Sequence, residues 1–214
     1  MSVEVKICGL TRPQDAAAAA ASGASYLGVV FASGPRVVTP AAARAIVAAA
    51  DGRPVLGVVG AASGDEILRL RDAAALSGVQ LHGVHTVADA ARLRREGLLV
   101  WRVARVAAWV DLAALDGLAA EADAVLVEPR VAHADGGSGV QLGLPVARAA
   151  RAALAGCRMV LAGGLTAELV GEVVGLVAPD IVDVSSGVEI QPGIKDPLKM
   201  DRFVEAARGS RPFA

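Results

Sequence analysis

Short apolar runs alternate with longer segments of mixed alanine and charged residues, and this alternation repeats eight times along the chain. The runs are rich in valine, leucine and isoleucine, and most are continuous rather than alternately apolar and polar. Continuous apolar runs are typical of parallel strands that are buried on both faces. We therefore expect strands at 3–8, 26–31, 54–59, 79–82, 98–103, 124–128, 158–162 and 181–185.

The segments between these runs have the length and composition of helices. We expect helices at about 12–21, 40–50, 65–76, 87–96, 109–120, 145–154, 167–177 and 198–208. Thr39 before Pro40 is a helix-start signal, because a hydroxyl can cap the helix and proline fits its first turn. Thr11, Thr86 and Thr166 stand before three further helices in the same way.

Eight strand-then-helix units in 214 residues correspond to about 27 residues each, close to the spacing of a (β/α)8 barrel, or TIM barrel. An open, doubly wound α/β sheet is the structural alternative. The glycine pattern G-x-G-x-x-G that marks one form of that sheet does not follow the first strand, and eight units close a barrel naturally. No linker or low-complexity segment divides the chain. We expect an α/β fold consisting of a single TIM-barrel domain over residues 1–214.

The composition excludes several classes of protein. Hydrophobic residues make up 54% of the chain and the mean hydropathy is +0.51, largely because of alanine. No apolar stretch reaches the roughly 18 residues that span a bilayer, and the first ten residues do not resemble a secretory signal. A net charge of −1 without a long basic run argues against a nucleic-acid partner. We expect a cytoplasmic protein that contacts neither membrane nor nucleic acid.

The first candidate chemistry lies at two strand ends, because a barrel carries its active site where its strands end. Cys8 ends the first strand and Glu128 ends the sixth. Cys8 can act as a general base if nearby cations lower its pKa, but it can equally be a small buried apolar residue. Glu128 can act as a general acid or form a salt bridge at the rim. Cys157 has no such position, and neither cysteine has neighbours at metal-ligand spacing, so we expect free thiols and no metal.

Further polar residues fall at the same end of the expected barrel. Arg36, in the loop after the second strand, can bind a carboxylate through its two-pronged guanidinium, or is a solvated loop residue. His82 ends the fourth strand and is either a substrate contact or a hydrogen-bonded structural residue. Arg102 and Asp183 lie near the ends of the fifth and eighth strands.

Glycine-rich turns follow the last strands and suggest a phosphate site. Barrels often bind phosphate with backbone N–H groups in the loops after strands seven and eight. Gly163 and Gly164 end the seventh strand, and Ser186 and Gly187 end the eighth. The run Gly137, Ser138 and Gly139, after the sixth strand, is assigned to the same site. A single loop of this kind is explained by chain reversal alone, whereas two at the expected places favour phosphate.

A set of motifs follows in order along the chain: Lys6-Ile7-Cys8-Gly9-Leu10-Thr11, Pro35-Arg36, Gln80-Leu81-His82-Gly83, Gly136-Gly137-Ser138-Gly139, Leu161-Ala162-Gly163-Gly164-Leu165, Asp183-Val184-Ser185-Ser186-Gly187-Val188-Glu189 and Pro192-Gly193-Ile194-Lys195-Asp196. Together they resemble the phosphoribosylanthranilate isomerase family of tryptophan biosynthesis over essentially the whole chain. The resemblance implies an Amadori rearrangement of a phosphorylated aminoaldose to an aminoketose without metal or organic cofactor. It implies a monomer or a homodimer.

The resemblance also implies roles for individual residues. Cys8 matches the base that removes the C2 proton, and Arg36 matches the residue that holds the anthranilate carboxylate. Asp183 matches an aspartate that contacts the substrate region. Glu128 stands where the family usually has an aspartate as the acid that protonates the ring oxygen, so its carboxyl reaches one methylene further.

Two other functions remain open from the sequence. One is a related phosphosugar isomerase with an altered substrate; such enzymes of histidine biosynthesis use a pair of aspartates, and Cys8 at the first strand argues against that chemistry. The other is a non-catalytic barrel that binds a phosphorylated ligand. Glu128 and the altered segment at Leu142-Gly143-Leu144 are the features that favour it.

Overall fold

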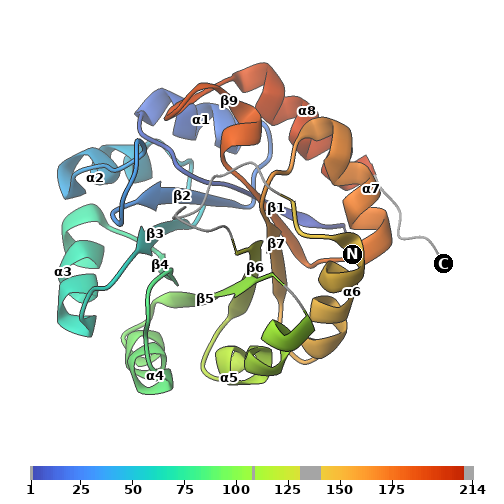
Figure 1. Cartoon of the computed structure of the whole chain (residues 1–214). Coiled ribbons are helices and arrows are strands. Elements are labelled where there is room, and N and C mark those ends of the chain that lie inside the picture. Colours follow the sequence, from blue (N-terminus) through green and yellow to red (C-terminus); the bar gives the residue numbers. More distant parts are fainter. Residues whose placement is uncertain (1, 108, 131–140, 210–214) are drawn as a thin grey trace.

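Eight parallel strands close into a barrel, and each strand pairs with its neighbour in the sequence until β8 returns to β1 (Figure 1). The computed structural model describes residues 2–107, 109–130 and 141–209. The strands are β1 (Glu4–Ile7), β2 (Tyr26–Val30), β3 (Val55–Val59), β4 (Gly78–Leu81), β5 (Leu99–Val106), β6 (Ala124–Pro129), β7 (Met159–Ala162) and β8 (Ile181–Val184). The predicted single-domain (β/α)8 fold is confirmed.

Helices form the outer ring around the strands, as Figure 1 shows. They are α1 (Pro13–Ala21), α2 (Pro40–Ala48), α3 (Gly64–Ala74), α4 (Val87–Arg95), α5 (Leu115–Ala119), α6 (Leu144–Ala153), α7 (Ala167–Val177) and α8 (Pro197–Gly209), with the 3-10 helices η1 (Trp109–Ala114) and η2 (Ser186–Val188). The last helix packs against both α1 and α7, which closes the outer ring. Among the described residues, no helix has the length and apolar character needed to cross a membrane.

Two of the four predicted threonine caps form. The Thr39 hydroxyl accepts a hydrogen bond from the Ala42 amide at 3.2 Å, and Thr86 accepts one from Asp89 at 3.1 Å. The prediction for Thr11 is wrong, because its hydroxyl donates to the Gly193 carbonyl at 2.5 Å instead of capping α1. Thr166 precedes α7 without a capping side-chain bond.

Three elements differ from the sequence prediction. Strand β5 runs to Val106, three residues further than expected, because it continues to pair with β6. The single helix expected at 109–120 is instead η1 followed by α5, with Gly117, a poor helix former, inside the second of these. A small antiparallel hairpin, β9 (Glu189–Gln191) with β10 (Ile194–Lys195), was not predicted.

The interior of the barrel is apolar beneath its open end. A cluster with Leu56, Trp101 and Leu126 fills it, and the Trp101 ring packs edge-on against Tyr26 with ring centres 5.0 Å apart. Side chains alternate between the two faces of a strand, so Arg105 shares the interior face of β5 with Trp101 but lies nearer its carboxyl end. Charged side chains therefore lie in the interior of the barrel nearer the carboxyl ends of the strands than this apolar layer.

Ser63 provides a test of how local sequence stabilises the outer ring. Its hydroxyl accepts from the Glu66 amide, and the Glu66 carboxylate accepts from the Ser63 amide at 2.7 Å, forming a capping box at the start of α3. Replacing Ser63 with alanine removes the hydrogen bond from the Glu66 amide to the Ser63 hydroxyl. We expect the free energy of unfolding to fall by about 1 kcal/mol. Urea unfolding measures it. Ser77→Ala, at an exposed loop position before β4, is the matched control, and equal losses in the two variants would contradict the assignment.

Candidate active site

A cavity of about 440 Å³ opens at the carboxyl ends of the strands. Of the polar side chains that the sequence predicted at this end, Arg102 does not line the cavity, and five others do: Cys8, Arg36, His82, Glu128 and Asp183. They come from β1, the loop after β2, and the ends of β4, β6 and β8. Gln80 and Ser185 join them in the wall. Residues up to 177 positions apart in the sequence, Cys8 and Ser185, thus surround one space.

Cys8 lies directly after β1, with only 7% of its surface exposed. Burial raises the pKa of its thiol, because a thiolate loses its hydration there. The cations Lys6 and Lys195 act in the opposite direction, but the net shift is upward. The condition set from the sequence, a thiol whose pKa is lowered overall, is therefore not met, and Cys8 holds its proton at neutral pH.

Lys6 is a fully buried cation that the sequence analysis did not single out. Its Nζ donates to Gln80 Oε1 and to Asp183 Oδ1, each at 2.9 Å, and lies 5.5 Å from the centre of the Trp101 ring. Burial acts to lower its pKa, but Asp183 and Cys8 together outweigh burial and the pKa is raised. Lys6 is therefore an ammonium ion.

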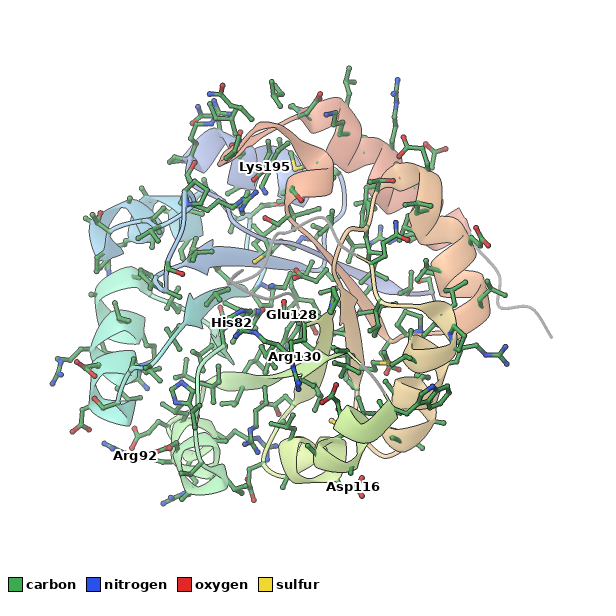
Figure 2. The ribbon with its side chains drawn as sticks, viewed as in Figure 1. His82, Arg92, Asp116, Glu128, Arg130 and Lys195 are labelled. Atoms are coloured by element: carbon green, nitrogen blue, oxygen red, sulfur yellow. The ribbon has the colours of Figure 1, made fainter. Side chains whose placement is uncertain are left out.

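One carboxylate oxygen of Glu128 contacts two neighbouring side chains. Figure 2 shows Glu128 beside His82 inside the barrel. Its Oε1 lies 3.1 Å from Arg105 Nε and 3.3 Å from His82 Nε2. Arg105 and Glu128 are register partners on β5 and β6. Burial raises the pKa of the Glu128 carboxyl in spite of Arg105, so this group keeps its proton to a higher pH than an exposed glutamate.

Arg105, rather than Arg102, is the arginine that β5 presents to the site. Arg102 donates instead to the backbone oxygens of Gly117 at 2.7 Å and His85 at 3.2 Å, so it links α5 to the loop after β4. The sequence prediction ended β5 at residue 103 and therefore placed the wrong arginine at the rim. An alternating pattern continued to Val106 would have found Arg105.

Arg36 makes a two-pronged contact with Glu189, at 2.8 Å from Nε to Oε1 and 2.7 Å from Nη2 to Oε2. The same carboxylate receives a hydrogen bond from Lys195 Nζ at 2.8 Å, and Lys195 also donates to the Ser185 carbonyl at 3.0 Å. Burial acts to raise the pKa of Glu189, but the two cations outweigh it and the net shift is downward. One edge of the Arg36 guanidinium is therefore occupied by an internal carboxylate, and sequence reasoning found neither Glu189 nor Lys195 as site residues.

The glycine turns of the predicted phosphate site meet at the ends of β7 and β8. Gly163 and Gly164 both have positive φ, at +103° and +62°, and Ser186 begins η2 directly after β8. A Cβ on Gly187 would overlap the carbonyl oxygen of Leu165, so only glycine lets these two loops approach so closely. Gly137, Ser138 and Gly139 lie outside the described residues.

Cys157 lies between α6 and β7, at the end of the barrel opposite the cavity. It is half-buried, and its thiol approaches the Arg158 carbonyl at 3.7 Å. Within the described ranges, no three His, Cys, Asp or Glu side chains are grouped as metal ligands.

The sequence is similar to one family of sugar isomerases over nearly its whole length. The family model for N-(5'-phosphoribosyl)anthranilate (PRA) isomerase matches residues 5–206. The N-(5'-phosphoribosyl)anthranilate isomerase of Pseudomonas fluorescens is 38% identical over 213 residues, which is 98% of this chain and 97% of that relative.

Solved structures of the same kind are similar in fold. The phosphoribosyl anthranilate isomerase of Thermotoga maritima has a TM-score of 0.87 at 31% identity, and the alignment covers 97% of this chain and 99% of that one. A phosphoribosyl anthranilate isomerase in complex with reduced 1-(o-carboxyphenylamino)-1-deoxyribulose 5-phosphate has a TM-score of 0.83 at 30% identity, with the same coverage.

The raised pKa of Cys8 can be measured directly in a Cys157→Ala variant, where Cys8 is the remaining thiol. Iodoacetamide reacts with the thiolate, and the thiolate population grows as the pH rises toward the pKa. We expect slow alkylation at neutral pH and a rate that still increases above about pH 9 without levelling. Mass spectrometry follows the reaction, with Cys8→Ala as the control for site. A rate that levels at or below pH 8 would overturn the raised pKa.

Proposed function

The chain belongs to the N-(5'-phosphoribosyl)anthranilate isomerase family, and on this premise we propose how its residues divide the chemistry of the reaction. It is an isomerase of tryptophan biosynthesis that converts N-(5'-phosphoribosyl)anthranilate to 1-(2-carboxyphenylamino)-1-deoxyribulose 5-phosphate. The observation that carries the proposal is that Cys8 and Glu128 line the same cavity from β1 and β6. A substrate in this space can be reached by both.

Glu128 is the general acid in this proposal. Its protonated carboxyl gives a proton to the furanose ring oxygen while the bond from C1 to that oxygen breaks. The lone pair of the anthranilate nitrogen then forms the C1–nitrogen double bond of a Schiff base. Burial supports this role, because it raises the pKa of Glu128 and so keeps the transferable proton on the carboxyl.

Cys8 is the general base. Its thiolate takes the proton from C2, and the electron pair of that bond forms the C1–C2 double bond of an enolamine, which neutralises the Schiff base. Transfer of the hydroxyl proton at C2 to C1 then completes the ketone. The oxidation of C2 is balanced by the reduction of C1, so the reaction needs no external oxidant or reductant.

The remaining residues hold the two ends of the substrate. We propose that Arg36 binds the anthranilate carboxylate, with Glu189 fixing the plane of its guanidinium. Asp183 and His82 contact the ribose portion from β8 and β4. Backbone N–H groups at Gly163, Gly164, Ser186 and Gly187 take the phosphate, and the earlier assignment of Gly137, Ser138 and Gly139 to that site stays a prediction.

The wider setting of the enzyme follows the sequence analysis. We propose one barrel domain over residues 1–214, a cytoplasmic location, and action as a monomer or a homodimer. A relative from Thermotoga maritima is described as a dimeric phosphoribosylanthranilate isomerase.

Removing either proton-transfer group tests the division of roles. Cys8→Ala and Glu128→Gln should each lower kcat by about 100-fold or more, because general acid–base groups contribute at least that factor. Glu128→Asp retains the acid and should keep much more activity than Glu128→Gln. The rate is measured by the loss of substrate fluorescence, with substrate generated in situ, and calorimetry checks that product still binds. Full activity in Cys8→Ala or in Glu128→Gln would remove that residue from its role.

The role of Arg36 can be tested with two ligands that differ in one group. Arg36→Ala should weaken binding of the reduced product analogue by about 10- to 100-fold, the usual effect of losing hydrogen bonds to a charged group. The analogue without its benzoate carboxylate should bind parent and variant alike. Equal weakening of both ligands in calorimetry would show that Arg36 acts only through the structure of its loop.

A further inference from the structure

Lys6 and Cys8 lie on the same interior face of the barrel at the start of the chain. They are two residues apart on β1, and alternate residues of a strand point to the same side. Gly28 on β2 lies beside both: a Cβ there would come within 2.8 Å of Cys8 Sγ and 3.1 Å of Lys6 Cε. The missing side chain of Gly28 therefore leaves room for the lysine and the thiol to lie next to each other.

The hydrogen bonds of Lys6 leave one donor for Cys8. An ammonium group has three N–H donors. Two are directed at Gln80 Oε1 and Asp183 Oδ1, both at 2.9 Å. The side chains of Lys6 and Cys8 are also within hydrogen-bonding reach of each other. Because Lys6 is fully buried, water does not compete for that third donor.

We propose that Lys6 is a positioning residue for proton abstraction. Its ammonium group stabilises the negative charge on Cys8 after the thiol has lost its proton. Gln80 and Asp183 fix the ammonium in place from β4 and β8. The inference rests on the proposed role of Cys8 as the base. It adds the group that stabilises the Cys8 thiolate. Lys6 keeps its own proton throughout, so its effect is electrostatic.

Other charges face Cys8, and they differ in sign and in partners. Asp183 repels the thiolate, while Lys195 attracts it. Lys195 and Arg36 share the carboxylate of Glu189, which offsets much of their positive charge. Within the part of the chain that the structure describes, the other titratable groups lining the cavity are His82 and Glu128. The Glu128 carboxylate lies against both His82 and Arg105. Lys6 has the strongest favourable effect of these charges on the thiolate.

Lys6 and Asp183 therefore act on Cys8 with opposite signs, and this opposition gives the test. In the Cys157→Ala background, the iodoacetamide rate at a fixed pH near 9 reports the thiolate fraction of Cys8. Lys6→Met should lower that rate by about tenfold or more, equivalent to a pKa rise of one unit, whereas Asp183→Asn should raise it. Arg95→Met, at an exposed position on α4 where the guanidinium donates to the Ala91 carbonyl of its own helix, removes the same net charge and should leave the rate unchanged.

The double variant Lys6→Met/Asp183→Asn distinguishes an effect on the thiolate from a folding defect. It removes the buried ion pair as a unit, so neither charge is left without its partner. Because Lys6 outweighs Asp183 in its effect on Cys8, the double variant should still alkylate more slowly than the parent. A rate equal to that of Asp183→Asn, or an unchanged rate in Lys6→Met, would overturn the proposal.

A comparison of kcat/KM with the alkylation rate, measured at the same pH, separates this inference from the role of Cys8. If Cys8→Ala is inactive, Lys6→Met should lower kcat/KM by the same factor as the alkylation rate. An active Cys8→Ala would refute Cys8 as the base while the alkylation results still decide whether Lys6 stabilises its thiolate. An inactive Cys8→Ala with normal alkylation in Lys6→Met would refute the role of Lys6 alone.

Discussion

The ion pair between Lys6 and Asp183 joins the first and last strands of the barrel, and the site is arranged around it. The two residues are register partners across the seam where β8 meets β1. Their contact at 2.9 Å is buried, and breaking one partner of a buried pair is strongly destabilising because the other charge stays without water. The ion pair that joins β1 to β8 thus also places the Lys6 ammonium group directly beneath the catalytic end of the barrel.

Every described charge around the cavity is opposed by another of opposite sign. Glu189 lies between Arg36 and Lys195, and Glu128 lies against Arg105. Such pairs keep side chains in one rotamer, so donors and acceptors are oriented before a ligand arrives.

The alternation of apolar runs and helices was sufficient to predict the barrel, because each strand and helix carries its own local pattern. The same local reasoning placed Cys8, Arg36, His82, Glu128 and Asp183 at one end, and the cavity brings these five together. Their roles were not determined by that placement.

Residues whose meaning depends on distant partners were missed. Lys6 reads as an isolated lysine in an apolar strand until its partner 177 positions away is known. Arg105 was missed because the expected strand ended at residue 103, whereas β5 continues to Val106 through its pairing with β6. The hairpin of β9 and β10 has only five strand residues in all, too few to produce a periodic signal.

Burial of both proton-transfer groups has a consequence for how the turnover number should be understood. With the roles proposed above, the reactive form carries a proton on the Glu128 carboxyl and none on Cys8, although the thiol is the stronger base of the two. Because burial raises the pKa of the thiol, most Cys8 side chains carry their proton at neutral pH, and the form with a thiolate is the minor one. With these roles, the rate of proton abstraction is the thiolate population multiplied by the rate constant of the thiolate, and a thiolate whose conjugate acid has a raised pKa is a stronger base. The same burial that makes the thiolate rare therefore makes it a more effective base.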